Sequence, residues 1–210
     1  MKRITLSALL MTLFLLIGCN NGGVKEDMAT TSDGSVIDLK KVSQKINDAV
    51  DFAASVKEVR ILVKSIDKLA KAIGQKIKND GGLDADGGQN GSLISGAYNI
   101  VLFADTKLGQ LENKEGISEE LKKKVTAAKQ KSTAFLTKLK EGHATLGKKE
   151  ASDEDAKKAI DITDATKDKG ASELVALNTA IGALVEAADA AVKSAITALT
   201  PAKAATSKDK

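Results

Sequence analysis

The sequence SVIDLKKVSQKINDAVDFAASVKEVRILVKSIDKLAKAIGQKI, residues 35–77, carries the clearest structural pattern in this chain of 210 residues. Apolar residues recur in it at three- and four-residue steps, the spacing of one helix face: Val42, Ile46, Ala49, Ala53, Val56, Val63, Ile66, Ala70, Ile73 and Ile77. A second stripe runs beside the first: Phe52, Val59, Leu62 and Leu69. We therefore predict a long amphipathic helix with Ser35 as its cap. Its wide apolar sector fits a dimer interface, although a wide intramolecular interface predicts the same pattern.

Similar patterns continue downstream, separated by turns. Glycines and aspartates crowd residues 79–91, NDGGLDADGGQNG, where we expect no regular structure. Ser92, Ser118 and Ser152 are suited to cap three more helices, the last one short. A final helix over residues 171–200 ends at Pro201. Because short turns favour antiparallel neighbours, the sequence predicts an all-α, up-and-down bundle. It has four long helices plus one short crossing helix, with long first and last helices antiparallel.

The first 23 residues, MKRITLSALLMTLFLLIGCNNGG, resemble a secretory leader. Two basic residues precede an uncharged apolar run, Leu6–Gly18, which is too short to span a bilayer. The run ends in Leu16-Ile17-Gly18-Cys19, a lipobox that predicts cleavage between Gly18 and Cys19 and acylation of Cys19. Acyl chains on this residue would anchor the protein to a membrane. We expect a signal peptide at 1–18, a lipidated flexible tether at 19–34, a bundle domain at 35–200 and a basic tail at 201–210.

The charge balance argues against a nucleic-acid partner. The formal net charge is only +4 at pH 7, and Arg60 is the one arginine after the leader. Recognition of phosphates and bases favours arginine. Cys19 is the only cysteine, so the exported domain must be stable without an internal disulfide.

Several segments resemble the variable small proteins of relapsing-fever spirochaetes and their relative, outer surface protein C of Lyme spirochaetes. They are the leader, Ala54–Ile77 (ASVKEVRILVKSIDKLAKAIGQKI), Asn90–Tyr98 (NGSLISGAY), Thr133–Gly147 (TAFLTKLKEGHATLG) and Gly170–Leu174. Ser132 stands where outer surface protein C carries a second cysteine, which favours the variable small protein branch.

The resemblance implies a lipoprotein anchored in the outer membrane and exposed on the cell surface. It also implies a homodimer with the first helix near the interface, and a variable antigen that meets host antibodies. Attachment to host tissue is a further implied role. Two alternatives stay open: an adhesin with one defined host ligand, and a structural lipoprotein facing the periplasm.

An enzyme is not expected, because no nucleophile with a recognisable base and no phosphate-binding loop is present. We expect no cofactor and no metal.

The loop residues Asp80, Asp84, Asp86 and Gln89 are a candidate ligand or antigenic site. A calcium site fails there, because counting from Asp84 places Gln89 at the position of the EF-hand glycine. His143, the only histidine, lacks partners with zinc spacing.

Two basic features are candidates for host contact. Lys124, Lys131 and Lys138 recur every seven residues on the third long helix, which could present a stripe to a sulfated glycan. Lysine stems also commonly cover the edge of a core, so a solvated flank is the simpler interpretation. The terminal Lys210 could occupy a kringle domain of a plasma protein such as plasminogen. Deletion of Lys210 would then abolish plasminogen binding.

Overall fold

The computed structural model describes residues 28–30 and 36–198, which fall into two compact units, one up to Lys41 and one from Val42. In the first unit, strands β1 (Met28–Thr30) and β2 (Val36–Asp38) pair antiparallel. Helix α2 begins directly afterwards, at Leu39, where the Asp38 carboxylate accepts a hydrogen bond from the Lys41 amide at 3.0 Å. Asp38 thus has the capping role that we expected for Ser35. Ser35 itself lies outside the described residues. Gly18, Cys19 and Lys210 also lie outside them.

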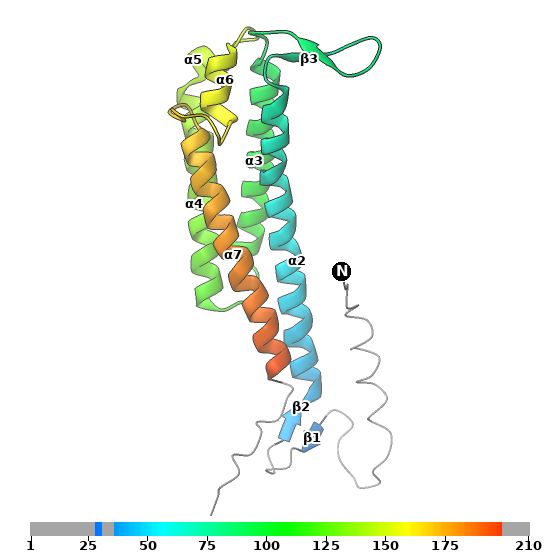
Figure 1. Cartoon of the computed structure of the whole chain (residues 1–210). Helices are drawn as coiled ribbons and strands as arrows, with labels where there is room; N and C mark the ends of the chain where they lie inside the picture. Colours follow the sequence, from blue (N-terminus) through cyan, green and yellow to red (C-terminus); the bar gives the residue numbers. More distant parts are fainter. Residues whose placement is uncertain (1–27, 31–35, 199–210) are drawn as a thin grey trace, which may run out of the picture. The chain divides into compact units, whose positions relative to one another are not determined.

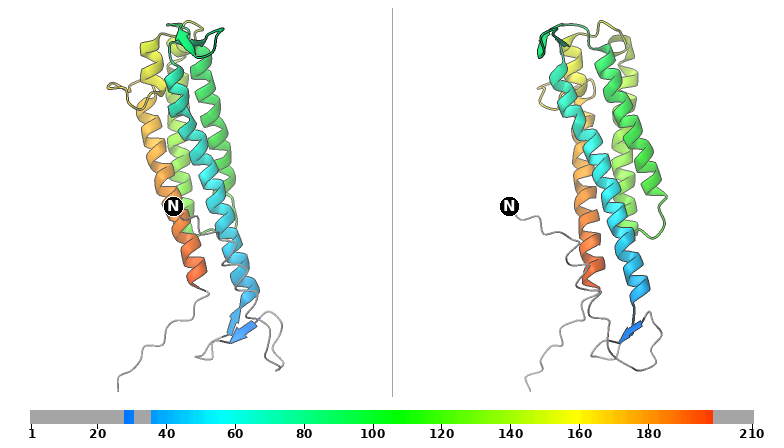
Figure 2. Two further views of the ribbon diagram at one scale, coloured as in Figure 1. Left: turned by 45° about the vertical axis from the view of Figure 1, so that its right-hand side comes forward. Right: turned by 90° about the vertical axis from the view of Figure 1, so that its right-hand side faces the viewer.

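The second unit is an antiparallel helical bundle, as predicted (Figures 1 and 2). Its four long helices are α2 (Leu39–Leu69), α3 (Gly91–Glu112), α4 (Glu119–Glu141) and α7 (Ala171–Thr197). Two short helices, α5 (His143–Leu146) and α6 (Asp153–Ile160), connect α4 to α7. Residues 79–91 and 147–170 lie at the end of this unit opposite Val42 (Figure 1).

The core is aliphatic and runs along the bundle. Its largest fully buried side chains are Phe52, Val56, Val59, Val63, Ile66, Leu108, Phe135, Ile160, Leu174, Leu177, Ile181 and Leu184. Each long helix contributes residues spaced by three or four positions, because only that spacing keeps side chains on one face. The helix α7 is also long and apolar enough to cross a membrane by length and composition. Its Leu174 and Leu177 are fully buried, which is the pattern of a helix in a bundle core.

The predicted caps are confirmed for two helices. The hydroxyl of Ser118 accepts a hydrogen bond from the Leu121 amide, and that of Ser152 accepts one from the Asp155 amide. The prediction for Ser92 is wrong. The helix α3 begins one residue earlier, at Gly91, and Asn90 holds the cap position. The Asn90 side chain does not cap α3, because it bonds to other segments.

The helix prediction is wrong at the end of α2. The α-helix ends at Leu69 and is followed by a single 3-10 turn, η1 (Ala70–Ala72). Gly74 then has a φ of +69°, a left-handed conformation that stops a right-handed helix. Strands β3 (Gln75–Ile77) and β4 (Leu83–Ala85) pair antiparallel, so residues 79–91 are not free of regular structure. Gly81 and Gly82, both with positive φ, make the turn between these strands.

The third long helix also ends earlier than its apolar pattern suggests. The helix α4 ends at Glu141, and Leu146 belongs to the separate turn α5. Gly142 separates the two helices, and its backbone amide bonds to the Lys138 carbonyl at 3.1 Å. Leu146 is still buried, at 2% exposure, so the apolar spacing of the sequence continues across the interruption of the helix.

Candidate functional site

The end of the bundle away from Val42 carries most of the irregular backbone, and we call it the hairpin end. It consists of the β3–β4 hairpin, α5, α6 and the loop over residues 161–170 (Figure 1). Every residue of β3 and β4 is exposed. Ile77 and Leu83 face each other across the two strands and are 82% and 53% exposed, respectively. This end therefore presents both polar and apolar side chains to solvent.

The candidate loop residues do not converge on a ligand. Asp84 accepts a hydrogen bond from the Ala85 amide at 2.9 Å, and Asp86 lies 3.5 Å from the Lys76 amine across the hairpin. Asp80 and Gln89 are exposed. Among the residues that the structure describes, no group of three or more His, Cys, Asp or Glu side chains is placed to hold a metal. The loop is therefore a displayed surface, in which local contacts hold two of the aspartates.

Asn90 and Asp153, which the sequence analysis did not single out as site residues, hold this hairpin to the bundle. The Asn90 side chain is 3% exposed and accepts from the Gly74 amide at 2.9 Å. Its amide group donates to the Ala151 carbonyl at 3.0 Å and to the Asp153 carboxylate at 2.8 Å. The same carboxylate accepts from the Gly88 amide at 2.8 Å. We call this set of contacts the Asn90 junction.

The junction explains one electrostatic feature and one glycine. Donation by the Gly88 amide, followed by donation from Asn90, lowers the pKa of Asp153, because both hydrogen bonds favour the charged carboxylate. Gly91 packs against the segment after α5, where an added Cβ would lie 2.2 Å from the Lys148 carbonyl oxygen. The only sequence signal for the junction is the pair Asn90-Gly91 directly before a helix. It gives no indication of the partners, which are up to 63 residues away.

The lysine stripe lies on one flank of α4. Lys131 is exposed, and Lys124 and Lys138 are partly buried. Lys138 lines a shallow hollow of about 220 Å³ that also includes Glu141, Asp168 and Lys169. Two carboxylates beside Lys138 reduce the positive field at that end of the stripe. The three amines nevertheless follow one line, because a seven-residue repeat brings a helix back to nearly the same face.

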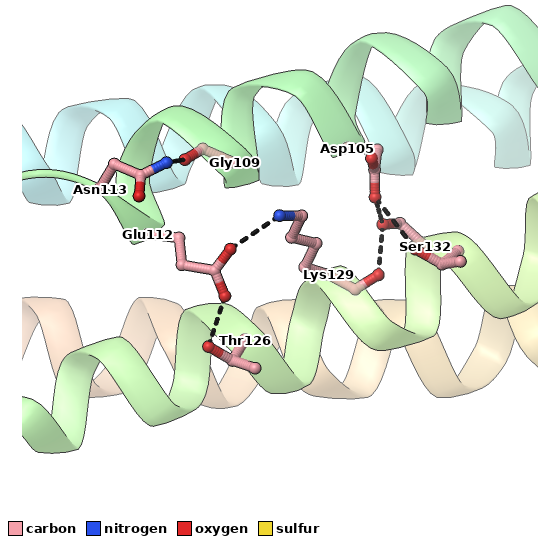
Figure 3. Close-up of polar contacts among 8 residues, drawn as sticks. Asp105, Gly109, Glu112, Asn113, Thr126, Lys129 and Ser132 are labelled. Atoms are coloured by element: carbon pink, nitrogen blue, oxygen red, sulfur yellow. Dashed lines mark hydrogen bonds and ion pairs between the residues drawn. The ribbon is translucent and has the colours of Figure 1, made fainter.

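The other flank of α4 faces α3 and holds a set of polar contacts (Figure 3). Glu112 accepts from the Lys129 amine at 2.7 Å and from the Thr126 hydroxyl at 2.6 Å. The hydrogen bond from Lys129, and after it the one from Thr126, lowers the pKa of Glu112. The same hydrogen bond with Glu112 raises the pKa of Lys129. Ser132 is fully buried and donates to Asp105. The contacts align α3 with α4 and show no arrangement for catalysis.

His143 is exposed at the start of α5. Its Nδ1 lies 3.1 Å from the Lys140 carbonyl oxygen, so this nitrogen carries the hydrogen.

Two large apolar side chains are exposed on a different surface: Ile61 on α2 at 70% and Phe103 on α3 at 52%. Glu58 on α2 and Lys107 on α3 form an ion pair at 2.9 Å. Ile61 lies about one turn after Glu58, and Phe103 lies about one turn before Lys107. Because α2 and α3 are antiparallel, both steps run in the same direction along the bundle. Ile61 and Phe103 therefore lie at similar heights on the bundle.

Comparison with known proteins agrees with the predicted resemblance. The Lipoprotein_6 family, described as lipoprotein, matches residues 36–205. Outer surface protein C of Borreliella burgdorferi is 48% identical over 205 residues, covering 95% of both chains. Variable small protein 11 of Borrelia hermsii is 47% identical over 209 residues, covering 96% of this chain and 98% of its own.

A solved structure gives the same result for the fold. Variable Small Protein 1 of Borrelia turicatae superposes with a TM-score of 0.74 at 57% identity, covering 78% of this chain and 99% of its own. The matching family is described as lipoprotein, and outer surface protein C is named for its place on the cell surface. This protein is therefore a member of the Lipoprotein_6 family of surface lipoproteins, together with outer surface protein C and the variable small proteins.

Proposed function

We propose that the protein is anchored in the outer membrane through acyl chains on Cys19 and serves immune evasion as a variable surface antigen. The observation that carries this proposal is the exposed hairpin end. The strands β3 and β4 are solvent-exposed along their whole length, and they lie opposite the end where the chain enters the bundle at Val42. A tethered bundle would hold this end towards antibodies.

The energetics of the bundle suit such a role. Exposed positions usually tolerate substitution within about 0.5 kcal/mol, whereas truncation of a buried aliphatic side chain costs about 2–5 kcal/mol. The surface of the hairpin end can therefore change while the core keeps one scaffold. An antibody that recognises one variant would then fail to bind the next.

The first prediction concerns display. Protease added to intact cells is expected to remove the helical domain, as measured by an antibody to that domain, with lysed cells as the reference. Protection on intact cells together with cleavage after lysis would contradict surface display. The alternative of a structural lipoprotein facing the periplasm would then be supported.

The second prediction concerns the antigenic surface. A variant carrying Asp80→Asn, Asp84→Asn and Asp86→Asn is expected to lose several-fold in binding to serum raised against the wild-type protein. The matched control changes three exposed carboxylates at the opposite end of the bundle: Glu115→Gln, Glu119→Gln and Glu120→Gln. An equal loss in both variants would mean that the hairpin end is not a preferred antigenic surface.

We also propose a homodimer in which α2 contributes to the interface. The exposed Ile61 and Phe103 support this, because large apolar side chains at one height form a surface that a second copy can cover. Ile61→Glu is expected to weaken the dimer at least about tenfold in sedimentation equilibrium. Ile77→Glu, at another highly exposed isoleucine, on the hairpin, is the control. A dimer unaffected by Ile61→Glu would place the interface elsewhere.

A second function, adhesion to a sulfated host glycan, is supported by the alignment of Lys124, Lys131 and Lys138. Changing all three to glutamine is expected to abolish retention on heparin at moderate salt, because such binding depends on the number of charges that contact the polymer. The control variant, Lys64→Gln, Lys68→Gln and Lys71→Gln, removes the same charge from the end of α2 and from η1. Unchanged retention in the first variant would exclude the stripe. The contact of Lys210 with plasminogen remains a prediction.

A further inference from the structure

Residues 79–91 contain three pairs in which an aspartate or asparagine precedes a glycine: Asp80-Gly81, Asp86-Gly87 and Asn90-Gly91. The glycine nitrogen of such a pair can attack Cγ of the preceding side chain and close a succinimide ring, because glycine has no side chain that obstructs the approach. An ionised carboxylate resists this attack, and aspartate is mostly ionised at neutral pH. An asparagine amide carries no charge. On chemical grounds alone, Asn90 should therefore react first.

The folded structure holds Asn90 in an unreactive arrangement. Its side chain is 3% exposed, and its oxygen and nitrogen make the three hydrogen bonds of the Asn90 junction. The nitrogen that would attack, in Gly91, donates to the Lys149 carbonyl at 3.3 Å. Ring closure has to bring this nitrogen onto Cγ of Asn90, which requires these contacts to break. The pair that is fastest by chemistry is thus the most restrained by the fold.

The second pair is anchored on both sides. The Asp86 carboxylate lies 3.5 Å from the Lys76 amine, and the Asp86 amide donates to the Gly74 carbonyl at 2.8 Å. On the other side, a Cβ added to Gly87 would lie 3.3 Å from Oδ2 of Asp153, and the next amide, in Gly88, donates to that carboxylate. The backbone of Asp86-Gly87 therefore has little freedom to rotate into a ring.

The first pair has almost no restraint. Asp80 is exposed, and within the described part of the chain its carboxylate has no hydrogen bond or ion pair. Gly81 has a φ of +88°, and a Cβ added to it would meet nothing within 4 Å. The Gly81 amide donates to the Lys78 carbonyl at 3.3 Å, which is longer than a usual N–H···O bond. The side chain and the attacking nitrogen of this pair can therefore reach each other at little cost.

We propose that Asp80 is a site of spontaneous conversion to isoaspartate, and that the fold reverses the intrinsic order of the three pairs. The reaction starts from the neutral carboxyl group. The Gly81 nitrogen forms a bond to Cγ of Asp80, and the carboxyl hydroxyl leaves as water with the hydrogen of the Gly81 amide. A second water then opens the ring at the original main-chain carbonyl carbon. One water is lost and one is gained, so no other reactant is needed.

The product differs from aspartate in its backbone and not in its charge. The main chain now runs through Cβ and Cγ of Asp80, and the original main-chain carbonyl carbon becomes a free carboxylate. The turn between β3 and β4 is thereby one atom longer. We expect this to weaken the hydrogen bond from the Lys78 amide to the Gly82 carbonyl, at 3.2 Å, which closes the turn. The proposal does not depend on the antigenic role.

The test compares the three pairs within one molecule. The intact protein is incubated at neutral pH and body temperature, with and without urea, and then digested briefly with trypsin. Cleavage after Lys78 and Lys107 leaves all three pairs in one peptide. Electron-transfer fragmentation of this peptide identifies isoaspartate, deamidation of Asn90 appears as a mass increase, and an unincubated digest is the reference.

The folded protein is expected to accumulate isoaspartate several-fold faster at Asp80 than at Asp86, with Asn90 nearly unchanged. In urea, Asn90 should react first. Faster reaction of Asn90 than of Asp80 in the folded protein would overturn the proposal. Equal rates at Asp80 and Asp86 would also overturn it, because the anchors of Asp86 would then have no effect.

Asp80→Asn provides a matched comparison, because it places the same Asn-Gly pair in the exposed turn and in the buried junction of one chain. Deamidation at position 80 is expected to be at least about tenfold faster than at Asn90, because the hydrogen bonds of Asn90 must break before its ring can close. Circular dichroism checks that the variant is folded. Equal rates at the two positions of the folded variant would refute control by the structure.

Discussion

Leu108→Ala is expected to lower the free energy of unfolding by about 2–5 kcal/mol. Leu108 is fully buried between α3 and the rest of the bundle, so truncation removes apolar contacts and leaves a cavity that rigid helices fill only partly. Each kcal/mol shifts the melting temperature of a chain of this size by roughly 2–4 °C. Thermal denaturation followed by circular dichroism should therefore show a decrease of at least about 4 °C.

The same helix offers a matched control. Leu102 lies on α3 six residues earlier and is 45% exposed, so Leu102→Ala makes the same chemical change at the surface. Its effect should stay within about 0.5 kcal/mol, and alanine is at least as favourable as leucine in a helix. Equal destabilisation by both variants would contradict the assigned helix face. Such a result would mean that the Leu102 side chain is shielded from solvent, for example by a second subunit.

The agreement between sequence and structure is closest where the pattern is local. On α4 the helical spacing of the sequence places Leu121, Val125, Ala128, Ser132, Phe135 and Leu139 on one face, and all six are buried. Helical periodicity determines which residues share a face, and a bundle must bury its apolar faces. Nothing distant in the sequence was needed for this inference. The same spacing places Leu174, Leu177, Ile181, Leu184, Ala188, Ala191 and Ala195 on one face of α7. The first five are buried and the last two are partly buried, while Leu199, which continues the spacing, lies outside the described residues.

The same periodicity was misleading at the end of α2. Ile73 and Ile77 continue the apolar spacing, yet Ile73 is half-buried outside the helix and Ile77 is exposed on the hairpin. A short apolar run fits a strand as well as a helix, so the pattern alone could not decide between them. The backbone leaves the helical conformation at Ile73, whose ψ is 127°, and Gly74 follows with a positive φ. A glycine inside an apolar pattern was therefore a warning that the helix does not continue to Ile77.

The site was predictable only in part. That the loop over residues 79–91 would be displayed followed from its composition, since glycines and aspartates supply little apolar surface to bury. Its attachment to the bundle did not follow, because Asn90 joins residues 16, 61 and 63 positions away. Such contacts arise only after the helices have packed. The shallow depression between α3, α4 and α5 was missed for the same reason, because residues of three separate elements line it.

Asn90→Ala is expected to destabilise the hairpin end strongly, by about 2–4 kcal/mol for the loss of three hydrogen bonds from a buried side chain. The Gly74 amide loses its acceptor, and the Ala151 carbonyl and the Asp153 carboxylate each lose a donor. Amide hydrogen exchange should show reduced protection at Gly74 and Gly88 before it changes in the core of α4. Asn113→Ala, at the exposed opposite end of α3, is the matched control and should leave both amides protected.

Acid should disrupt the same junction through Asp153. Its pKa is lowered in the folded protein, so the stabilisation is complete above the unfolded value of about 3.9 and is lost as pH falls through the folded value. Asn90 is one cause of that lowered pKa. Asn90→Ala should therefore raise the pKa of Asp153 towards its ordinary value and shift the loss of Gly88 protection to a higher pH. If both proteins lose Gly88 protection at the same pH, Asn90 does not stabilise the carboxylate. The hairpin would then be held mainly by its backbone contacts.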